Sequence, residues 1–143
     1  PATCKAILKV IDQQNYQLQG KEVVIINNSI LVGRPLAMML TQAGATVTLC
    51  HIDTKNLNKK ISQADVLIPA TGKAGLVDWK LIKDNALVID VGISRIDGKV
   101  KGDVGLPDKT DDLSFDITPV PGGIGPMTIA LLLENVVVLA ERQ

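Results

Sequence analysis

The sequence predicts an α/β fold with a doubly wound, mostly parallel sheet. Runs of β-branched residues alternate with segments of helical periodicity, and the first run is apolar throughout, as in strands buried on both faces. Most glycines outside turns follow these runs. The 143 residues suffice for one domain with a full hydrophobic core. We therefore expect residues 1–143 to form a single domain with right-handed crossovers.

The predicted order begins with a helix and a buried strand. Apolar residues from Cys4 to Ile11 recur at helical spacing, which predicts an amphipathic helix over residues 3–14, capped by Thr3. The run EVVIIN at 22–27 predicts the first strand, because continuous β-branched sequence is typical of the centre of a parallel sheet.

A second helix is predicted over residues 33–44. It carries Pro35, which a helix tolerates only in its first turn, and Gly44 is a typical C-terminal stop. Asp97 and Gly98 predict a tight turn. The remaining elements are expected in this order: a strand at 45–51, a short polar helix at 54–64, strands at 65–71 and 85–92, a small excursion at 96–105, a strand at 115–121 and a helix from about 126 to 140.

Composition excludes several classes of function. Acidic and basic residues balance to a formal net charge of zero, so a nucleic-acid partner is not expected. Cys4 and Cys50 lack metal-ligand spacing and indicate buried thiols in a reducing, cytoplasmic compartment, with no metal site. The apolar run 129–140 is interrupted by Glu134 and is predicted to be too short to span a membrane. The chain begins at Pro1 without a methionine, which indicates a fragment or a processed product.

The turn after the first strand predicts a nucleotide site. In a doubly wound sheet, ligands bind beyond the carboxyl ends of the strands, and a pyrophosphate is attracted to the helix N-terminus there. NNSILVG does not match G-x-G-x-x-G, but Asn27 can adopt left-handed φ, Ser29 can donate to a phosphate and Gly33 permits close approach. The alternative is an ordinary strand-to-helix turn.

The end of the second strand, CHIDT, offers a carboxylate. Asp53 is placed to grip an adenosine ribose hydroxyl, or else to cap the helix at 54–64, a role that Thr54 could also fill. His51 could border the adenine pocket. With no acidic or cysteine partner beside it, we do not assign His51 acid-base work.

The next two loops are rich in glycine. Gly72 and Gly92 are expected to let the backbone approach a flat ligand closely. Asp90 ends an apolar strand and is interpreted as a buried carboxylate satisfied by neighbouring amides rather than as a catalyst. Lys73 is interpreted as a solvated loop charge.

The stretch TPVPGGIGPMT at 118–128 alternates proline with glycine, which predicts a stiff loop of unusual shape. Residues 119–123 are expected to form a rigid wall facing the cofactor. Pro126 is expected at the first helical position, with the Thr128 hydroxyl turned toward the cleft.

This loop and four further stretches together resemble the cofactor-binding domain of the bifunctional methylenetetrahydrofolate dehydrogenase/cyclohydrolase family, the FolD type. The similarity runs over essentially the whole chain in the family's order: VGRPLAMMLTQAGATVTLCH, ADVLIPATGKAG, ALVIDVGI, KGDVG and TPVPGGIGPMT. The resemblance implies a Rossmann-type NAD(P)-binding domain. It also implies an enzyme that transfers hydride from 5,10-methylene-tetrahydrofolate to a nicotinamide, then hydrolyses the methenyl product to 10-formyl-tetrahydrofolate, in one-carbon metabolism and purine biosynthesis.

The resemblance also implies roles for residues. The cofactor would contact Asn27, Asn28, Ser29, Gly33, His51, Ile52, Asp53, Gly72, Gly92, Ile93 and Thr128, and the folate site would be lined by Pro121, Gly122 and Gly123. The folate would lie in a cleft shared with a preceding N-terminal domain that supplies the catalytic lysine and tyrosine, so no catalytic residue is assigned in this chain. The family is typically homodimeric through this domain. The isolated chain is expected to bind cofactor with little turnover.

Two departures from the family pattern favour NAD over NADP. Asn27-Asn28-Ser29 replaces Gly-Arg-Ser, and His51-Ile52 replaces His-Ser. A missing guanidinium and hydroxyl, with Asp53 close by, disfavour a 2′-phosphate, although Lys55 could partly restore affinity. The alternatives are a non-catalytic dinucleotide-binding module, or the cofactor domain of another small-molecule dehydrogenase.

Overall fold

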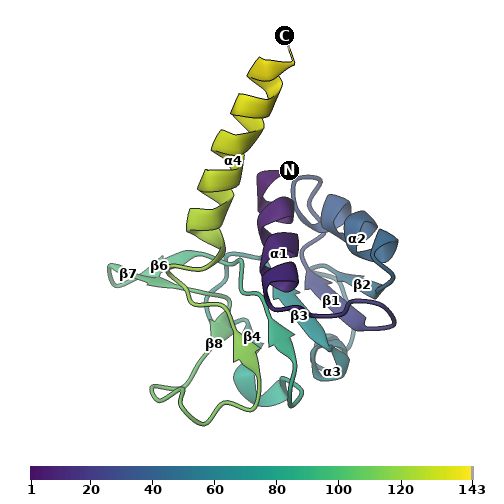
Figure 1. The fold of residues 1–143 in the computed structure, drawn as a ribbon. Coiled ribbons are helices and arrows are strands. Elements are labelled where there is room, and N and C mark those ends of the chain that lie inside the picture. Colours follow the sequence, from purple (N-terminus) through teal and green to yellow (C-terminus); the bar gives the residue numbers. More distant parts are fainter. Residues whose placement is uncertain (143) are drawn as a thin grey trace.

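The computed structural model describes residues 1–142, which fold around one five-stranded parallel sheet (Figure 1). Its strand order is β2-β1-β3-β5-β9, and every neighbouring pair is parallel. The strands are β1 (Glu22–Ile26), β2 (Thr46–Cys50), β3 (Val66–Pro69), β5 (Leu87–Val88) and β9 (Asp116–Ile117). The chain moves outward from β1 first to β2 and then, on the other side, to β3. This reversal confirms the predicted doubly wound sheet.

Helices cover both faces of the sheet. They are α1 (Ala2–Gln13), α2 (Gly33–Gln42), α3 (Leu57–Gln63) and the 3-10 helix η1 (Trp79–Leu81). Val23 and Ile25 pack in one core with α1 and α2, whereas Val24 and Ile26 pack in a second core with α3. Alternate side chains of a strand point to opposite faces, so β1 must be apolar at both sets of positions. Burial on both faces explains why residues 23–26, in the middle of this run, are all β-branched.

The later strands are shorter than predicted. β5 has two residues instead of the expected 85–92, although its ladder continues through Ile89 N–H to the Leu67 carbonyl (2.9 Å) and Val91 N–H to the Pro69 carbonyl (2.9 Å). After Val91 the chain leaves the sheet, and Ser94 Oγ bonds the Gly72 carbonyl in the loop after β3. The loop that follows β5 therefore lies at the carboxyl edge of the sheet.

Two small sheets flank the main one. β6 (Ser94–Ile96) and β7 (Lys99–Lys101) form an antiparallel hairpin, and both turn residues Asp97 and Gly98 have positive φ, which confirms the predicted turn. β4 (Val77–Asp78) pairs in parallel with β8 (Val104–Gly105). The sequence analysis missed this second pair because two-residue strands carry no periodicity.

Helix ends partly agree with the predictions. Pro35 lies in the first turn of α2 and Gly44 follows its end with φ +86°, as expected. The predicted cap by Thr3 is wrong, because α1 already begins at Ala2 and Thr3 lies inside it. Pro126 is the third residue of α4 (Ile124–Glu141) rather than its first. A proline is tolerated throughout the first turn, since the amides there have no partner within the helix.

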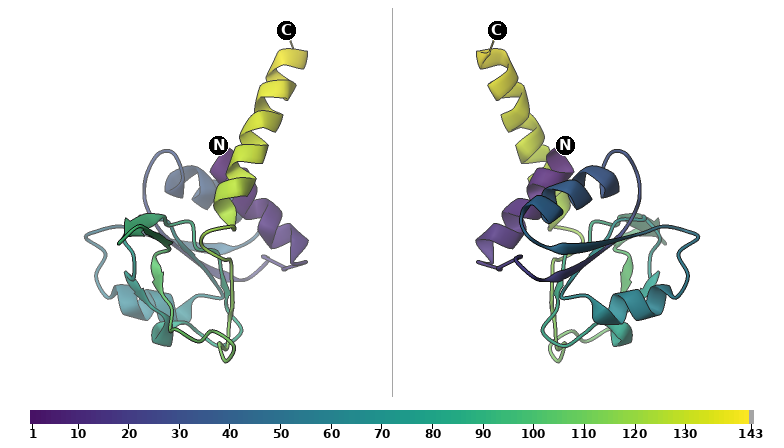
Figure 2. Two further views of the ribbon diagram at one scale, coloured as in Figure 1. Left: turned by 90° about the vertical axis from the view of Figure 1, so that its left-hand side faces the viewer. Right: turned by 90° about the vertical axis from the view of Figure 1, so that its right-hand side faces the viewer.

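α4 projects away from the body of the molecule, and its N-terminal part lies beside α1 (Figure 2). Its 18 residues make it long and apolar enough to cross a membrane by length and composition alone, with 11% of them buried. The sequence analysis expected the apolar run 129–140 to be too short to span a membrane. This expectation about length is wrong, because the helix also includes residues 124–128. Midway along it, Asn135 Oδ1 accepts a hydrogen bond from Lys5 Nζ of α1.

Candidate functional site

A cavity of about 370 Å³ opens at the carboxyl ends of β1, β2 and β3. Five residues that the sequence analysis assigned to the cofactor line it together: Asn27, Asn28, Ser29, His51 and Ile52. The other lining residues are Ile26, Thr54, Leu57, Thr71, Lys73 and Leu76. Lys73 is thus a cavity residue and not only a solvated loop charge. Its lining combines apolar side chains such as Ile26 and Leu57 with polar ones such as Ser29, as expected for a site that holds a flat ring and a charged group.

Side chains shape the turn between β1 and α2. Asn27 Oδ1 accepts the Ser29 N–H (2.7 Å), and Asn27 Nδ2 donates to the Ala70 carbonyl at the end of β3 (2.6 Å). Ser29 Oγ accepts the Val32 N–H (3.1 Å). As an acceptor in that bond, the Ser29 hydroxyl keeps its own proton for donation to a ligand. Asn27 therefore ties two cavity loops together, and Ser29 presents a donor.

Gly33 has a packing role in the structure. It is buried, and a Cβ there would overlap the Asn27 carbonyl, so only glycine lets α2 start this close to β1. Gly33 does not line the cavity, and its predicted phosphate contact stays a prediction. The next residue, Arg34, places its Nε 2.9 Å from the Asn28 carbonyl. The sequence analysis did not predict this guanidinium beside the cavity, because the family pattern has the arginine that would contact a 2′-phosphate at position 28.

The turn after β2 is organised by its own side chains. The His51 N–H donates to Thr54 Oγ1 (2.8 Å), and the Asp53 N–H donates to His51 Nδ1 (3.3 Å). Among residues 1–142, α3 begins after Asn56 without a side-chain cap, so the capping role proposed for Asp53 or Thr54 is wrong. The statement that His51 lacks an acidic partner is also wrong, because Asp53 Oδ2 lies 3.7 Å from its Nδ1. Asp53 itself points outward, with its side chain 86% exposed.

A second cavity, of about 130 Å³, lies at the carboxyl end of β5. It is formed by Asp90, Val91 and Ile93 together with residues 119–126, and so includes Pro121, Gly122 and Gly123. Gly122 has φ +104° and the Val120–Pro121 peptide is cis. The proline-glycine loop therefore stands at the same sheet edge as the first cavity, as the sequence analysis required. Thr128 is half-buried and lines neither cavity.

Two buried carboxylates lie behind these loops. Asp90 is 3% exposed and accepts three backbone N–H bonds, from Gly92 (3.0 Å), Asp103 (3.1 Å) and Val104 (2.9 Å). This confirms the interpretation of Asp90 as a carboxylate satisfied by amides. Burial raises the pKa of Asp90, the neighbouring Asp103 adds to the rise, and the three amide bonds oppose it. Asp103 was not singled out from the sequence.

The glycines of the two loops differ in exposure. Gly72 is exposed with φ +69°, and its carbonyl accepts a hydrogen bond from Ser94 Oγ (2.6 Å). Gly92 is buried, and a Cβ there would overlap the Asp103 carboxylate. The requirement for glycine at 92 thus comes from the protein's own packing, while Gly72 remains open to a ligand. Ile93, next to Gly92, is 57% exposed in the second cavity.

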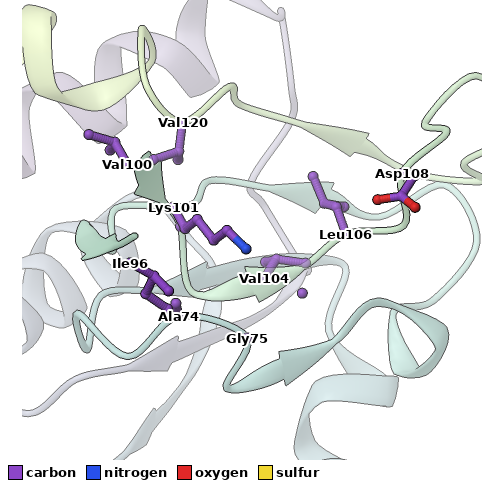
Figure 3. A pocket seen from close by; sticks show the side chains of 11 residues that line it. Ala74, Gly75, Ile96, Val100, Lys101, Val104, Leu106, Asp108 and Val120 are labelled. Atoms are coloured by element: carbon purple, nitrogen blue, oxygen red, sulfur yellow. The ribbon is translucent and has the colours of Figure 1, made fainter. Parts of the chain in front are cut away.

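A third cavity, of about 390 Å³, lies on the other side of this region (Figure 3). Val120 lines both the second and the third cavity and separates them. Lys101 extends across the opening, among Ile96, Val104 and Leu106. Gly102 and Val104, on either side of Asp103, also line this cavity.

Comparison with known proteins places these features in a family. The family model described as tetrahydrofolate dehydrogenase/cyclohydrolase, NAD(P)-binding domain, matches residues 1–143. The chain is 48% identical to the bifunctional protein FolD of Bordetella bronchiseptica, over 99% of this chain and 50% of that protein. The FolD methylenetetrahydrofolate dehydrogenase/cyclohydrolase structure from Campylobacter jejuni is 47% identical, with a TM-score of 0.92, over 99% of this chain and 50% of that one.

A further solved structure carries a ligand in its description. The Trypanosoma brucei methylenetetrahydrofolate dehydrogenase-cyclohydrolase, complexed with NADP and an inhibitor, is 32% identical with a TM-score of 0.87, over 99% of this chain and 50% of that one. The chain therefore spans about half the length of the relatives that it matches.

Proposed function

Because this chain belongs to the tetrahydrofolate dehydrogenase/cyclohydrolase family as its NAD(P)-binding domain, we propose that it binds a nicotinamide dinucleotide across the carboxyl edge of its sheet. The observation that carries the proposal is the first cavity, where the ends of three parallel strands bring together five residues predicted for the cofactor. The second cavity, at β5, gives the same ligand a place for its other end.

The residues of the first cavity fit this group. The pyrophosphate lies at the β1–α2 turn, where the Ser29 hydroxyl has a proton to donate and the N-terminus of α2 carries positive partial charge. The adenosine lies against His51 and Ile52, which line the cavity. Its ribose is proposed to lie near Asp53, whose exposed carboxylate stands outside the cavity. The nicotinamide end reaches Gly72, Gly92 and Ile93. Pro121, Gly122 and Gly123, which line the second cavity, then form the folate side, and Thr128 of α4 is proposed as a further cofactor contact outside the two cavities.

In the longer protein, the chain serves the oxidation of 5,10-methylene-tetrahydrofolate and the hydrolysis of the methenyl product to 10-formyl-tetrahydrofolate. When bound, the nicotinamide supplies the hydride acceptor. The residues of this chain hold and orient the dinucleotide, and the proline-glycine wall limits the cleft on the folate side. No catalytic side chain is assigned within the chain, so turnover requires the N-terminal half that its relatives possess.

The same proposal extends to partners and location. α4 exposes apolar side chains along most of its length, among them Leu132, Leu133 and Val136, which are 55%, 63% and 58% exposed. A surface of this kind is normally covered by protein. We assign it to contacts beyond this chain, with the N-terminal half or with a second copy in a homodimer. As a separate part of the proposal, the protein acts in the cytoplasm, in one-carbon metabolism and purine biosynthesis.

NAD is the favoured cofactor. Asn28 and Ile52, which line the cavity, offer neither a guanidinium nor a hydroxyl to a 2′-phosphate. Lys73 on the rim and Arg34 beside Asn28 supply positive charge, which reduces the preference. The Arg34 Nε is engaged by the Asn28 carbonyl, so part of its donor capacity is already used. The net preference for NAD is therefore modest.

Calorimetric titration of the 143-residue chain with NAD and with NADP tests the proposal. We expect NAD to bind more tightly, and Asn28→Arg to reverse the order because a guanidinium then faces the 2′-phosphate. Asn58→Arg adds the same charge at an exposed position that lines none of the cavities, and should leave the order unchanged. Equal affinities in the unmodified chain would contradict the NAD preference, and no binding of either dinucleotide would contradict the proposed function.

A further inference from the structure

One buried side chain contacts both of the loops that follow β3 and β5. Asp103 lies between β7 and β8, and 0% of it is exposed to solvent. Its Oδ2 accepts two hydrogen bonds from Thr71, one from the backbone N–H (2.6 Å) and one from the hydroxyl (2.8 Å). Thr71 lines the first cavity. The carboxylate therefore holds the loop after β3 at both its backbone and its side chain.

The other oxygen of Asp103 faces the second loop. Asp103 Oδ1 has no hydrogen-bond partner in the part of the chain that the structure describes, and it occupies the space that a Cβ of Gly92 would need. Asp90 fixes this arrangement from below, since its Oδ1 accepts the N–H of both Gly92 and Asp103. Asp90 therefore holds the backbone of Asp103 beside that of Gly92, independently of the bonds between Asp103 and Thr71.

The two loops also contact each other directly. Ser94 Oγ donates to the Gly72 carbonyl (2.6 Å), and a Cβ on Gly72 would lie 3.6 Å from the Ile93 carbonyl. This contact is at the surface, whereas the two bonds from Thr71 to Asp103 are partly buried and the bond from the Asp103 N–H to Asp90 is buried. The mutual placement of the loops is therefore set from the interior.

A purely structural role does not require a carboxylate here. A buried carboxylate with one unpaired oxygen is costly, and among residues 1–142 neither Asp90 nor Asp103 has a lysine, arginine or histidine as an ion-pair partner. A neutral side chain could bond Thr71 without that cost. What the carboxylate adds is a strong acceptor that takes both donors of one residue on one oxygen.

From this geometry we propose that Asp103 is a positioning residue for the cofactor site: acting through Thr71 and against Gly92, it sets the loop after β3 relative to the loop after β5. In the proposed binding mode the nicotinamide end reaches Gly72 in the loop after β3 and Gly92 and Ile93 in the loop after β5. Thr71 also lines the first cavity, so Asp103 determines whether the two loops can hold one dinucleotide together. This inference rests on the proposed function. It concerns a residue that itself lines none of the three cavities.

The test is a double-mutant cycle on NAD affinity, measured by calorimetry in the 143-residue chain. We expect Asp103→Asn and Thr71→Val each to weaken NAD binding about tenfold, because each removes part of a hydrogen-bonded pair that involves a charged group. The double variant should be no weaker than either single variant, since both act through one contact. Thr71→Ser keeps the hydroxyl and should restore affinity. Thr110→Val, an exposed position outside the cavities, is the matched control and should bind as the unmodified chain does.

Amide chemical shifts measured without ligand separate this inference from the proposed function. Asp103→Asn and Thr71→Val should both displace the amide signals of Gly92 and Ile93, although Thr71 lies about twenty residues away in sequence. If these variants lower the melting temperature but leave NAD affinity within twofold, or if their effects on affinity simply add, the positioning role is wrong. Failure of the unmodified chain to bind either dinucleotide overturns the proposed function, and unchanged Gly92 and Ile93 signals then overturn the placement of the loops as well.

Discussion

The sheet and α4 use apolar side chains in opposite ways. In the sheet, β1 buries Val23 to Ile26 completely or nearly so, because helices of the same chain cover both faces. In α4, only Ile124 and Leu131 are buried, although the helix is far more apolar than α1 or α2. The first region is covered by helices of this chain, whereas the second leaves most of its apolar side chains exposed, and under the proposed function these contact another protein surface. Stability should therefore depend on the sheet and its loops, and association on α4.

The largest effect on stability should come from adding a methyl group at Gly92, which packs against the Asp103 carboxylate. Gly92→Ala places a methyl group where the Asp103 carboxylate lies, and neither group can move without breaking buried hydrogen bonds. We expect a loss of about 3 kcal/mol or more in the free energy of unfolding, measured by urea denaturation. Gly125→Ala is the control in α4, because its Cβ would meet only Ile93 Cδ1 at 3.8 Å. A loss below about 1 kcal/mol for Gly92→Ala would contradict the packing described here.

A substitution in α4 should show the reverse pattern. Leu133 and Val137 are 63% and 55% exposed, so replacing both with glutamine removes apolar surface that this chain does not bury. We expect the free energy of unfolding to change by less than about 0.5 kcal/mol. Self-association, measured by sedimentation velocity, should weaken about tenfold or more if these side chains are covered in a dimer. A large loss of stability without any change in association would show that α4 belongs to the core of the chain after all.

The smallest effect concerns a surface ion pair at the opposite end of the sheet. Lys83 Nζ bonds Asp65 Oδ1, which lowers the pKa of Asp65. A lowered folded-state pKa gives stability that is present above the unfolded value of about 3.9 and is lost as the pH falls through the folded value. Lys83→Met should therefore be slightly less stable than the unmodified chain at pH 7.

The measurement is the difference in melting temperature between the two proteins across a pH series. The difference should begin to shrink as the pH falls below about 4, where Asp65 becomes protonated in the unfolded state, and should disappear below the lowered folded-state pKa, where Asp65 is protonated in both states. A difference that grows on acidification would contradict the assigned direction. The effect is small in any case, since Lys83 is half exposed and surface ion pairs are screened by water.

Much of the fold could be predicted from local patterns. The β-branched run of β1, the helical spacing of α1, and the Asp97-Gly98 turn each report a conformation that the local residues themselves favour. Short strands such as β4 and β8 could not be found, because their pairing depends on residues far away along the chain rather than on their own composition.

The candidate site divides in the same way. Asn27, Ser29 and His51 could be predicted as cavity residues because the end of a parallel strand is a known position for ligands, whatever the rest of the chain does. The contact of Asp103 with Thr71, 32 residues earlier, could not. Neither could the position of Arg34 beside Asn28, or the reason for glycine at 92.

Sequence alone therefore determined the alternation of strands and helices, the sheet edge at which the first two cavities open, and the family. Tertiary structure decided which residues support that edge from behind, and which apolar helix remains uncovered. The reason is physical: backbone preferences and periodicity act over a few neighbouring residues, whereas burial and hydrogen bonding join residues that only the completed fold brings into contact.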